Sequence, residues 1–337
     1  MNLQIHVREP FSFSQTLTFL RRFLPCQEDF VLTADSLTAA VTVAGRAVTF
    51  TIREADGLWL ACEDALDAPA LLARASELIG ARDDLASFYA TAANDPPMHG
   101  LVAELHGLHH VRFLTLEEIC VYAVIMQRTP ITIASRLKRR FMDRFGLPIE
   151  IAGRTLRALP SSDVLGRLDG KAIGEAIGHA RKGEVIAEVL RGVAAIGEAT
   201  LREAPYAEAR DALLAIRGIG PFSAAAILLR GLGRMDELPE LRGFADTART
   251  LYGGSYDDAA IRARYGRDIG HWAFYLKTGV AQRSDATRGD RLSRSPDLSM
   301  LRKCPSRSVK PTSRTSTAFA PPRSRAPRRS SRSIRPT

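Results

Sequence analysis

The sequence predicts an α+β protein, with a small β-rich domain followed by a larger helical domain. Over residues 1–65, short apolar or β-branched runs alternate with turn residues. From residue 83 to about residue 277, apolar positions recur instead at helical spacing. Residues 283–337 are dominated by Arg, Ser, Pro and Thr, and this composition buries too little apolar surface to offset the cost of ordering. We therefore expect domains over residues 1–82 and 83–282 and a disordered tail over residues 283–337.

The first domain is expected to combine one sheet with a few helices. Asp-Ser, Gly-Arg and Asp-Gly pairs separate its later apolar runs, and such pairs favour tight turns. Residues 12–23 have the apolar spacing of a helix that stops before Pro25, and residues 68–80 return to that spacing. The expected strands cover residues 3–7, 30–32, 37–43, 47–52 and 58–62.

The second domain is expected to be nearly all helix. Thr115 and Glu118 have the spacing of a capping box, and Gly146 and Pro148 would close the helix before them. The expected helices cover residues 84–93, 98–105, 115–127, 131–145, 161–168, 170–178, 182–195, 206–216, 222–231, 244–252 and 257–265.

The net charge of +10 is concentrated in the tail. Residues 283–337 hold 13 Arg and 2 Lys against 3 Asp, which leaves 32 basic and 34 acidic residues in 1–282. Any nucleic-acid affinity of the folded body must therefore come from a local patch or from backbone amides. Two interpretations of the tail stay open. It is either a basic arm that adds salt-sensitive DNA affinity, or an accidental extension such as a shifted reading frame.

Several classes of protein are disfavoured by simple features of the sequence. The N-terminus lacks a basic segment followed by an apolar run, and no stretch reaches the roughly 18 apolar residues that span a bilayer, so we expect a cytoplasmic protein without membrane partners. His109 and His110 have no acidic partner at ligand spacing and are interpreted as solvated. Four cysteines form no C-x2-C pair, so we expect buried thiols and no metal site: Cys26, Cys62, Cys120 and Cys304.

The sharpest motif spans Leu213 to Leu229, with the sequence LLAIRGIGPFSAAAILL. It matches the pattern h-x2-h-x-G-h-G-x3-A-x3-h-h at every specified position, where h is apolar. The small Ala224 would let two helices pack closely. The motif therefore predicts a helical hairpin whose turn is glycine-rich.

This turn, Gly218-Ile219-Gly220, is suited to binding a DNA phosphate. Glycine permits positive φ and lets another surface approach without a Cβ in the way, while Ile219 would pack back into the core. With Pro221 in its first turn, the second helix would begin with free amides, which form an anion site. The competing interpretation is an ordinary helical hairpin with a glycine turn. The motif Gly231-Leu232-Gly233 is not a nucleotide-binding loop, because it lacks a preceding strand and a Lys-Ser/Thr pair.

With this hairpin, the chain resembles the helix-hairpin-helix superfamily of DNA glycosylases, and within it the bacterial 3-methyladenine glycosylase II type. Residues 229–239, LRGLGRMDELP, look like the run that follows the hairpin in that family, and residues 123–134, AVIMQRTPITIA, are similar to its DNA-wedging segment. The likeness covers most of residues 1–280. It implies that the β-rich domain is TATA-binding-protein-like, and no four-cysteine cluster of the iron–sulfur branch is present.

The resemblance assigns roles to particular residues. Gln127 and Arg128 occupy the positions that enter the duplex and fill the gap left by a flipped base. The hairpin residues that would contact DNA are Gly218, Ile219, Gly220, Phe222 and Ser223.

The base pocket implied by the resemblance is aromatic. Phe222 lies where the family places an aromatic residue against the target base, and Trp272 and Tyr275 lie in a closing helix that would line the same pocket. Aromatic faces suit an electron-poor alkylated purine through cation–π attraction. A buried core position is the competing interpretation for each of them.

The catalytic position departs from the family pattern. The family's aspartate follows the Pro of the Leu-Pro element by two residues, and here that position is Leu241. Leucine cannot activate water or stabilise a cationic sugar, so the adjacent Glu240 is the candidate acid/base residue. A positioned acid/base group contributes about 10²–10⁴-fold, and N-alkylated purines are already good leaving groups.

Two functions therefore follow from the sequence. The first is a monofunctional glycosylase that excises alkylated purines from double-stranded DNA in base excision repair; no lysine at the hairpin edge could form a Schiff base. The second is a non-catalytic protein that binds lesions or abasic sites. The resemblance implies a nucleoid-associated monomer that needs no cofactor beyond an alkali-metal ion at the hairpin backbone.

Overall fold

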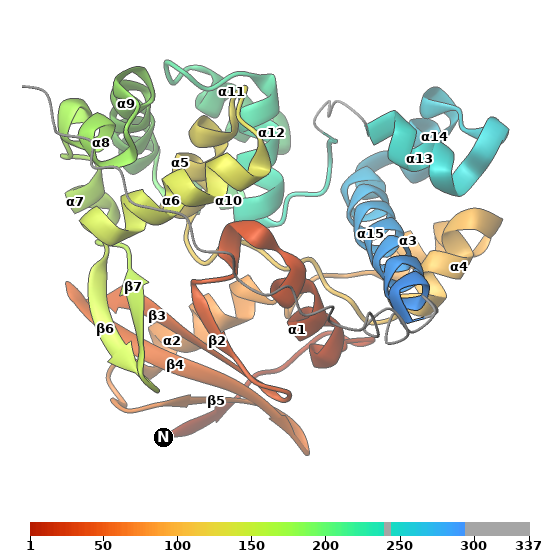
Figure 1. Cartoon of the computed structure of the whole chain (residues 1–337), viewed down its shortest axis with the longest axis horizontal. Coiled ribbons are helices and arrows are strands. Elements are labelled where there is room, and N and C mark those ends of the chain that lie inside the picture. Colours follow the sequence, from red (N-terminus) through yellow and green to blue (C-terminus); the bar gives the residue numbers. More distant parts are fainter. Residues whose placement is uncertain (239–243, 294–337) are drawn as a thin grey trace, which may run out of the picture. The chain divides into compact units, whose positions relative to one another are not determined.

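The fold is described by a computed structural model of residues 1–238 and 244–293, with side chains described up to residue 285 outside that gap. The chain divides into a unit of Met1–Gly289 and a second of Asp290–Thr337. The first unit contains a mixed fold of one five-stranded sheet, one two-stranded sheet and many helices (Figure 1). No described helix carries an apolar stretch long enough to cross a lipid bilayer.

The five expected strands are confirmed and form one antiparallel sheet in the order β1-β5-β4-β3-β2. Successive side chains of a strand point to opposite faces of the sheet. In β5, Leu58, Leu60 and Cys62 are therefore buried, while the residues between them are partly exposed. The buried face packs on α1 (Phe13–Arg22) and α2 (Ala68–Leu78). The strands are β1 (Asn2–Gln4), β2 (Phe30–Leu32), β3 (Ser36–Val43), β4 (Arg46–Ala55) and β5 (Gly57–Cys62).

A two-stranded hairpin interrupts the helical region and was not expected from the sequence. Strands β6 (Leu147–Ile151) and β7 (Arg154–Ala158) pair through a turn at Ala152 and Gly153, both of which have positive φ. Leu156 and Ala158 pack against Ala40, on strand β3 of the larger sheet. The helical region is therefore not purely helical, because this hairpin extends the β-rich part.

The expected helices are otherwise confirmed with small shifts of their ends. Asp169 and His179 cap α8 and α9, and left-handed glycines end α8 and α12. The helices are α3 (Ala86–Ala93), α4 (Pro96–Glu104), α5 (Leu116–Met126), α6 (Ile131–Phe145), α7 (Ser162–Leu165), α8 (Gly170–Ile177), α9 (Ala180–Ile196), α10 (Glu198–Glu203), α11 (Tyr206–Leu214), α12 (Pro221–Leu232), α13 (Phe244–Tyr252), α14 (Asp258–Tyr265) and α15 (Ile269–Ser293), with short 3₁₀ turns at Leu24–Cys26, Gly253–Ser255 and Gly266–Asp268.

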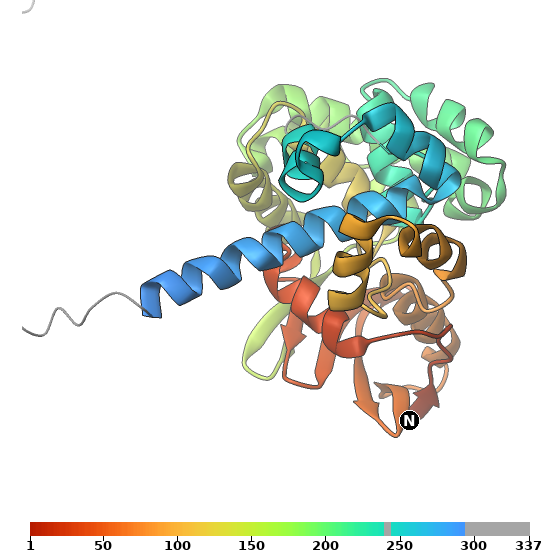
Figure 2. The same cartoon turned by 90° about the vertical axis from the view of Figure 1, so that its right-hand side faces the viewer.

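Two hydrophobic cores organise these elements. The larger core joins the sheet to α5, α6, α8, α9, α11 and α12, and the smaller one joins α3, α4, α13, α14 and α15. Helix α15 passes beside α1, where Arg22 donates a hydrogen bond to the Ala281 carbonyl (Figures 1 and 2). Phe19 of α1 also packs against the smaller core, so the two cores meet at α1 and α15.

Two details differ from the sequence-based expectations, and a third agrees with them. Helix α15 continues to Ser293, beyond residue 282 where we placed the end of the domain, and residues 294–337 lie outside the described part. His109 and His110 are buried, not solvated; the two ring nitrogens of His109 lie 2.7 Å from the Gly80 carbonyl oxygen and 2.9 Å from that of Pro10. The described cysteines, Cys26, Cys62 and Cys120, are buried free thiols, as expected.

Candidate DNA interface and base pocket

Helices α11 and α12 form the expected hairpin, and its turn faces outward. Gly218 is exposed with φ +97°, and Gly220 caps α12 without a side-chain hydrogen bond. The N–H groups of Phe222 and Ser223 fall in the first turn of α12, where a helix supplies no intrahelical partner. Ile219 is only 6% exposed, which confirms that it packs into the core. The turn therefore offers main-chain amides to a partner instead of being covered by the sheet.

The two glycines of this turn are present for different reasons. A Cβ at Gly218 would overlap a methyl group of Val185 on α9, so the fold itself requires glycine there. Gly220 has φ −100°, and a Cβ at this position would meet no atom within 4 Å. Nothing within the described protein requires glycine at 220. A close-approaching external surface would require it.

The segment between α5 and α6 is fastened to the hairpin. Gln127 Nε2 donates to the Gly218 carbonyl at 2.9 Å and to Ser223 Oγ at 3.2 Å. Lys182 Nζ donates to the Gln127 carbonyl at 2.9 Å and to Thr129 Oγ1 at 2.6 Å. Arg128 is exposed at the tip with φ +53°, an unusual conformation for a side chain of its size. Gln127 therefore braces the hairpin, whereas Arg128 is exposed beside it.

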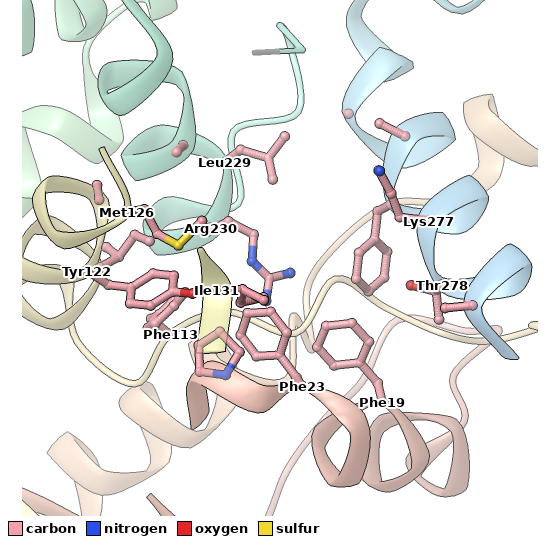
Figure 3. A pocket seen from close by; sticks show the side chains of 18 of the residues that line it. Phe19, Phe23, Phe113, Tyr122, Met126, Ile131, Leu229, Arg230, Lys277 and Thr278 are labelled. Atoms are coloured by element: carbon pink, nitrogen blue, oxygen red, sulfur yellow. The ribbon is translucent and has the colours of Figure 1, made fainter. Parts of the chain in front are cut away.

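A cavity of about 470 Å³ opens beside Phe222, within the size range of small-molecule pockets (Figure 3). Its walls are mostly aromatic or aliphatic and come mainly from α1, α5, α12 and α15, with contributions from the first residues of α6 and α13 and from the loop that carries Phe113. The hairpin helix α12 thus carries the exposed turn at one end and cavity-lining residues along its length. Further lining residues are Phe19, Phe23, Tyr122, Met126, Ile131, Leu229, Arg230, Leu238, Phe244, Phe274, Lys277 and Thr278.

Arg230 is the most unusual residue in this cavity. Its guanidinium carbon lies 4.4 Å from the ring centroid of Phe23, and three other rings surround it at 5.3–5.9 Å, those of Phe19, Phe113 and Phe274. Its Nη1 is hydrogen-bonded to His110 Nε2 at 3.1 Å, and its buried Nη2 has no hydrogen-bond partner.

Burial determines the protonation states of Arg230 and His110. Desolvation lowers the pKa of Arg230 to about 10, so the guanidinium is still charged at neutral pH. Burial, with the nearby charge of Arg230, holds the pKa of His110 well below its usual value. His110 is therefore neutral, and its Nε2 accepts the hydrogen bond from Arg230.

Phe222 lines the cavity, but Trp272 and Tyr275 do not. Both are fully buried in the smaller core, on a different face of α15 from the lining residues. Trp272 Nε1 donates to Tyr252 Oη at 2.8 Å, and Tyr275 Oη donates to the Leu108 carbonyl at 2.9 Å. The sequence analysis placed the right helix at the pocket but chose the wrong face.

The candidate acid/base residue Glu240, with Leu241, lies outside the described residues. The described lining includes the cations Arg22, Arg230 and Lys277 and no Asp or Glu. Lys277 Nζ is 3.1 Å from Thr247 Oγ1 and 5.2 Å from the Phe244 ring centroid, and burial lowers its pKa. The sequence analysis missed Arg230 and Lys277. The one available signal was that Lys277 follows Ala273 and Phe274 at helical spacing.

A buried polar cluster lies next to two lining residues of the cavity, since Lys138 Nζ donates to the Pro25 carbonyl at 3.0 Å and lies 5.8 Å from the Phe113 ring centroid. Cys26, Asp29 and Glu118 could share a metal ion, since their ligand atoms lie within 4.8 Å of one another. Lys138 Nζ already occupies this space, 2.5 Å from Asp29 Oδ2 and 2.7 Å from Glu118 Oε1. The Lys138 ammonium group therefore provides the positive charge that a metal ion would otherwise bring to these carboxylates.

Two curated relatives match parts of the chain. A DNA-3-methyladenine glycosylase of Bacillus subtilis is 28% identical over 152 residues, covering 44% of this chain and 50% of the relative. A probable bifunctional transcriptional activator/DNA repair enzyme AlkA of Mycobacterium tuberculosis is 27% identical over 184 residues, covering 53% and 36%. The matched segments thus span half or less of these relatives. No protein-family model matches the chain.

Solved structures match over nearly the whole first unit. A 3-methyladenine DNA-glycosylase from Archaeoglobus fulgidus superposes with a TM-score of 0.67 at 20% identity, covering 82% of this chain and 96% of that one. MBOgg1 in complex with a low-affinity DNA ligand gives 0.64 at 19% identity, covering 84% and 96%. At these identities the likeness establishes the fold. Together with the sequence relatives and the exposed hairpin beside a cavity, it makes the chain similar in sequence and in fold to DNA glycosylases of the helix-hairpin-helix superfamily.

Proposed function

We propose that this protein is a monofunctional DNA glycosylase that excises damaged purines, of the alkylated class acted on by its Bacillus relative, from double-stranded DNA. One observation carries the proposal: helix α12 presents an exposed, uncapped N-terminus at Gly220 and lines a 470 Å³ cavity with Phe222. A phosphate held at the turn would therefore position the adjoining nucleotide at the mouth of a cavity lined by apolar side chains.

The reaction would proceed in three physical steps. The main-chain N–H groups of Gly220, Phe222 and Ser223 bind a backbone phosphate. The target base leaves the stack and enters the cavity, while Arg128 fills the gap, at a flipping cost of a few kcal/mol. A water oxygen then attacks C1′ as the C1′–N bond breaks; a cationic alkylated base takes the bond electrons and leaves as the neutral purine, and the proton of the attacking water passes to a base and then to solvent. Glu240 would activate the water or stabilise the cationic sugar.

The alternative is a lesion-binding protein without chemistry. Leu241 occupies the position of the family's aspartate, and the described cavity lining contains no carboxylate that could replace it. Such a protein would keep the hairpin and the cavity, and it would bind abasic-site DNA without releasing any base.

A single assay separates the two functions. Base release from methylated duplex DNA is measured for the wild type, Glu240→Gln and the control Glu237→Gln, whose carboxylate pairs with Arg210 at 2.8 Å. The proposal expects release by the wild type and the control and about a 10²-fold or greater loss in Glu240→Gln. Tight binding to an abasic-site analogue without release would support the alternative. Equal release by Glu240→Gln would remove this residue from the mechanism.

An alkali-metal ion, a TATA-binding-protein-type domain and a monomeric state are also part of the proposed function. The Gly218 carbonyl accepts one hydrogen bond, from Gln127, and its second lone pair is available to an alkali-metal ion bridging to DNA. The five-stranded antiparallel sheet with α1 and α2 supports a small domain of TATA-binding-protein type. We propose that the protein acts as a monomer on duplex DNA at alkylated or abasic sites.

A further inference from the structure

Helix α6 carries three exposed arginines on one of its faces. Arg136, Arg140 and Arg144 are four residues apart, so they lie one helical turn above another, on the side of α6 that faces away from its buried residues. The Arg140 guanidinium lies beside Gly178, in the turn between α8 and α9. We call these three residues the arginine face.

The arginine face is not neutralised within the described part of the chain, where the ion pairs of α6 involve other side chains. Arg139 pairs with Glu28, and Asp143 pairs with Arg157 at 2.6 Å. Like charges four residues apart on a helix repel one another and lower its stability. The arrangement therefore contributes nothing favourable to folding, and an external anion would relieve the repulsion.

The position of α6 indicates which anion can reach this face. The helix starts directly after the segment of Gln127, which is fastened to the hairpin turn, and its first residue, Ile131, lines the cavity. It ends beside the β6–β7 hairpin (Figure 1). At 1.5 Å per residue, Arg136 lies roughly 8 Å and Arg144 roughly 20 Å along the helix axis from Ile131. Each strand of a duplex carries a phosphate about every 3.4 Å along its axis, so a face of this length can follow several phosphates.

We propose that the arginine face of α6 is a second DNA-binding surface, which contacts backbone phosphates that flank the lesion. Residues 1–282 hold 32 basic and 34 acidic residues, so a cluster of three uncompensated cations is a local feature and not a consequence of bulk charge. Contacts to phosphates carry no sequence information, and this surface would strengthen binding to damaged and undamaged duplex alike. The inference rests on the proposed function and adds to it a surface outside the hairpin and the cavity.

The test measures binding against salt concentration for two duplexes, one undamaged and one with a central abasic-site analogue. Arg136→Gln/Arg140→Gln removes two charges and keeps side chains that favour a helix. If each arginine neutralises one phosphate, the slope of log affinity against log salt should fall by about 1.8 for both duplexes. The control Arg139→Gln/Arg157→Gln removes the same charge from two arginines that are already paired, and it should keep the wild-type slope.

Uncharged methylphosphonate linkages locate the contacts on the DNA. They replace short blocks of phosphates at increasing distance from the abasic analogue, on the damaged strand in one series and on the opposite strand in the other. A block that the arginine face contacts should weaken binding by the wild type and have little further effect on Arg136→Gln/Arg140→Gln. Urea denaturation verifies that both double variants are folded.

The outcomes separate this inference from the proposed function. Equal salt slopes for the wild type and Arg136→Gln/Arg140→Gln overturn the inference, and so does an equal loss in the paired-arginine control, which would reflect net charge alone. Full methylphosphonate effects in Arg136→Gln/Arg140→Gln at every block overturn it as well. Failure of the wild type to prefer the abasic analogue over undamaged duplex would count against the proposed function, while the salt slopes still decide whether α6 binds phosphates.

Discussion

At the scale of single residues, the two glycines of the hairpin turn differ in whether the fold itself requires them. Gly218 combines φ +97° with a backbone that lies against Val185, so any side chain there conflicts with the protein itself. Gly220 has ordinary negative φ and open space around its missing Cβ. Beside the first-turn amides of α12, this open space is where the proposed DNA phosphate would bind.

Alanine substitutions at the two positions should therefore affect different properties: stability at position 218 and duplex binding at position 220. Gly218→Ala should lower the free energy of unfolding by about 2 kcal/mol, from positive-φ strain and overlap with Val185. Gly220→Ala should change stability by less than about 0.5 kcal/mol but weaken duplex binding roughly tenfold, since a methyl group displaces the phosphate from the amides. Urea denaturation and a binding titration at fixed salt check both. Unchanged duplex affinity in Gly220→Ala would remove the turn from the interface.

At the scale of elements, helix α5 links the cavity to a buried charge cluster. Thr115 Oγ1 accepts a hydrogen bond from the Glu118 N–H at 3.2 Å, which is half of the expected capping box. The Glu118 side chain does not return to Thr115, because it pairs with Lys138 on α6. Tyr122, one turn further along α5, lines the cavity. The charge cluster therefore fixes α5 and α6 on either side of the segment that carries Arg128.

This cluster predicts a pH dependence of stability. Burial raises the pKa of Glu118 to about 7 against the pull of Lys138. The folded state then holds this proton more tightly than the unfolded state, whose pKa is near 4.5. The resulting stability is complete below about pH 4.5 and is lost as the pH rises through 7, by an amount on the order of 2–3 kcal/mol.

Denaturation at pH 5 and pH 8 measures this loss. The wild type should be less stable at pH 8 from this contribution, and Glu118→Gln should remove most of the difference because a neutral amide does not ionise. The control Glu117→Gln changes the adjacent carboxylate and should retain the wild-type difference. A Glu118→Gln protein with the full wild-type pH dependence would show that another group is responsible.

At the scale of the whole molecule, sequence patterns predicted elements better than their assembly. The sheet and the hairpin were found because alternation and the Gly-x-Gly turn are local signals. The β6–β7 pair was missed because Gly146 and Pro148 were interpreted only as a helix stop. Trp272 and Tyr275 were assigned to the wrong face because the rotation of a helix is set by its tertiary partners. The environment of Arg230 combines four distant phenylalanines, and no local pattern contains it.

Positive charge is concentrated outside the folded body, in residues 294–337, which hold 10 Arg and 2 Lys against one Asp. The body is slightly negative, so backbone amides and a few side chains must provide its affinity for DNA.

If the terminal segment contacts phosphates, each neutralised phosphate adds about 0.9 to the slope of log affinity against log salt. Truncation after Ser293 should therefore flatten that slope and weaken binding to undamaged duplex at low salt. The affinity ratio between lesion and undamaged DNA should stay nearly the same, because phosphate contacts of this segment contribute equally to both complexes while the cavity and the hairpin are retained. Equal slopes for the full and truncated chains would mean that this segment makes no phosphate contacts and that all DNA affinity resides in residues 1–293.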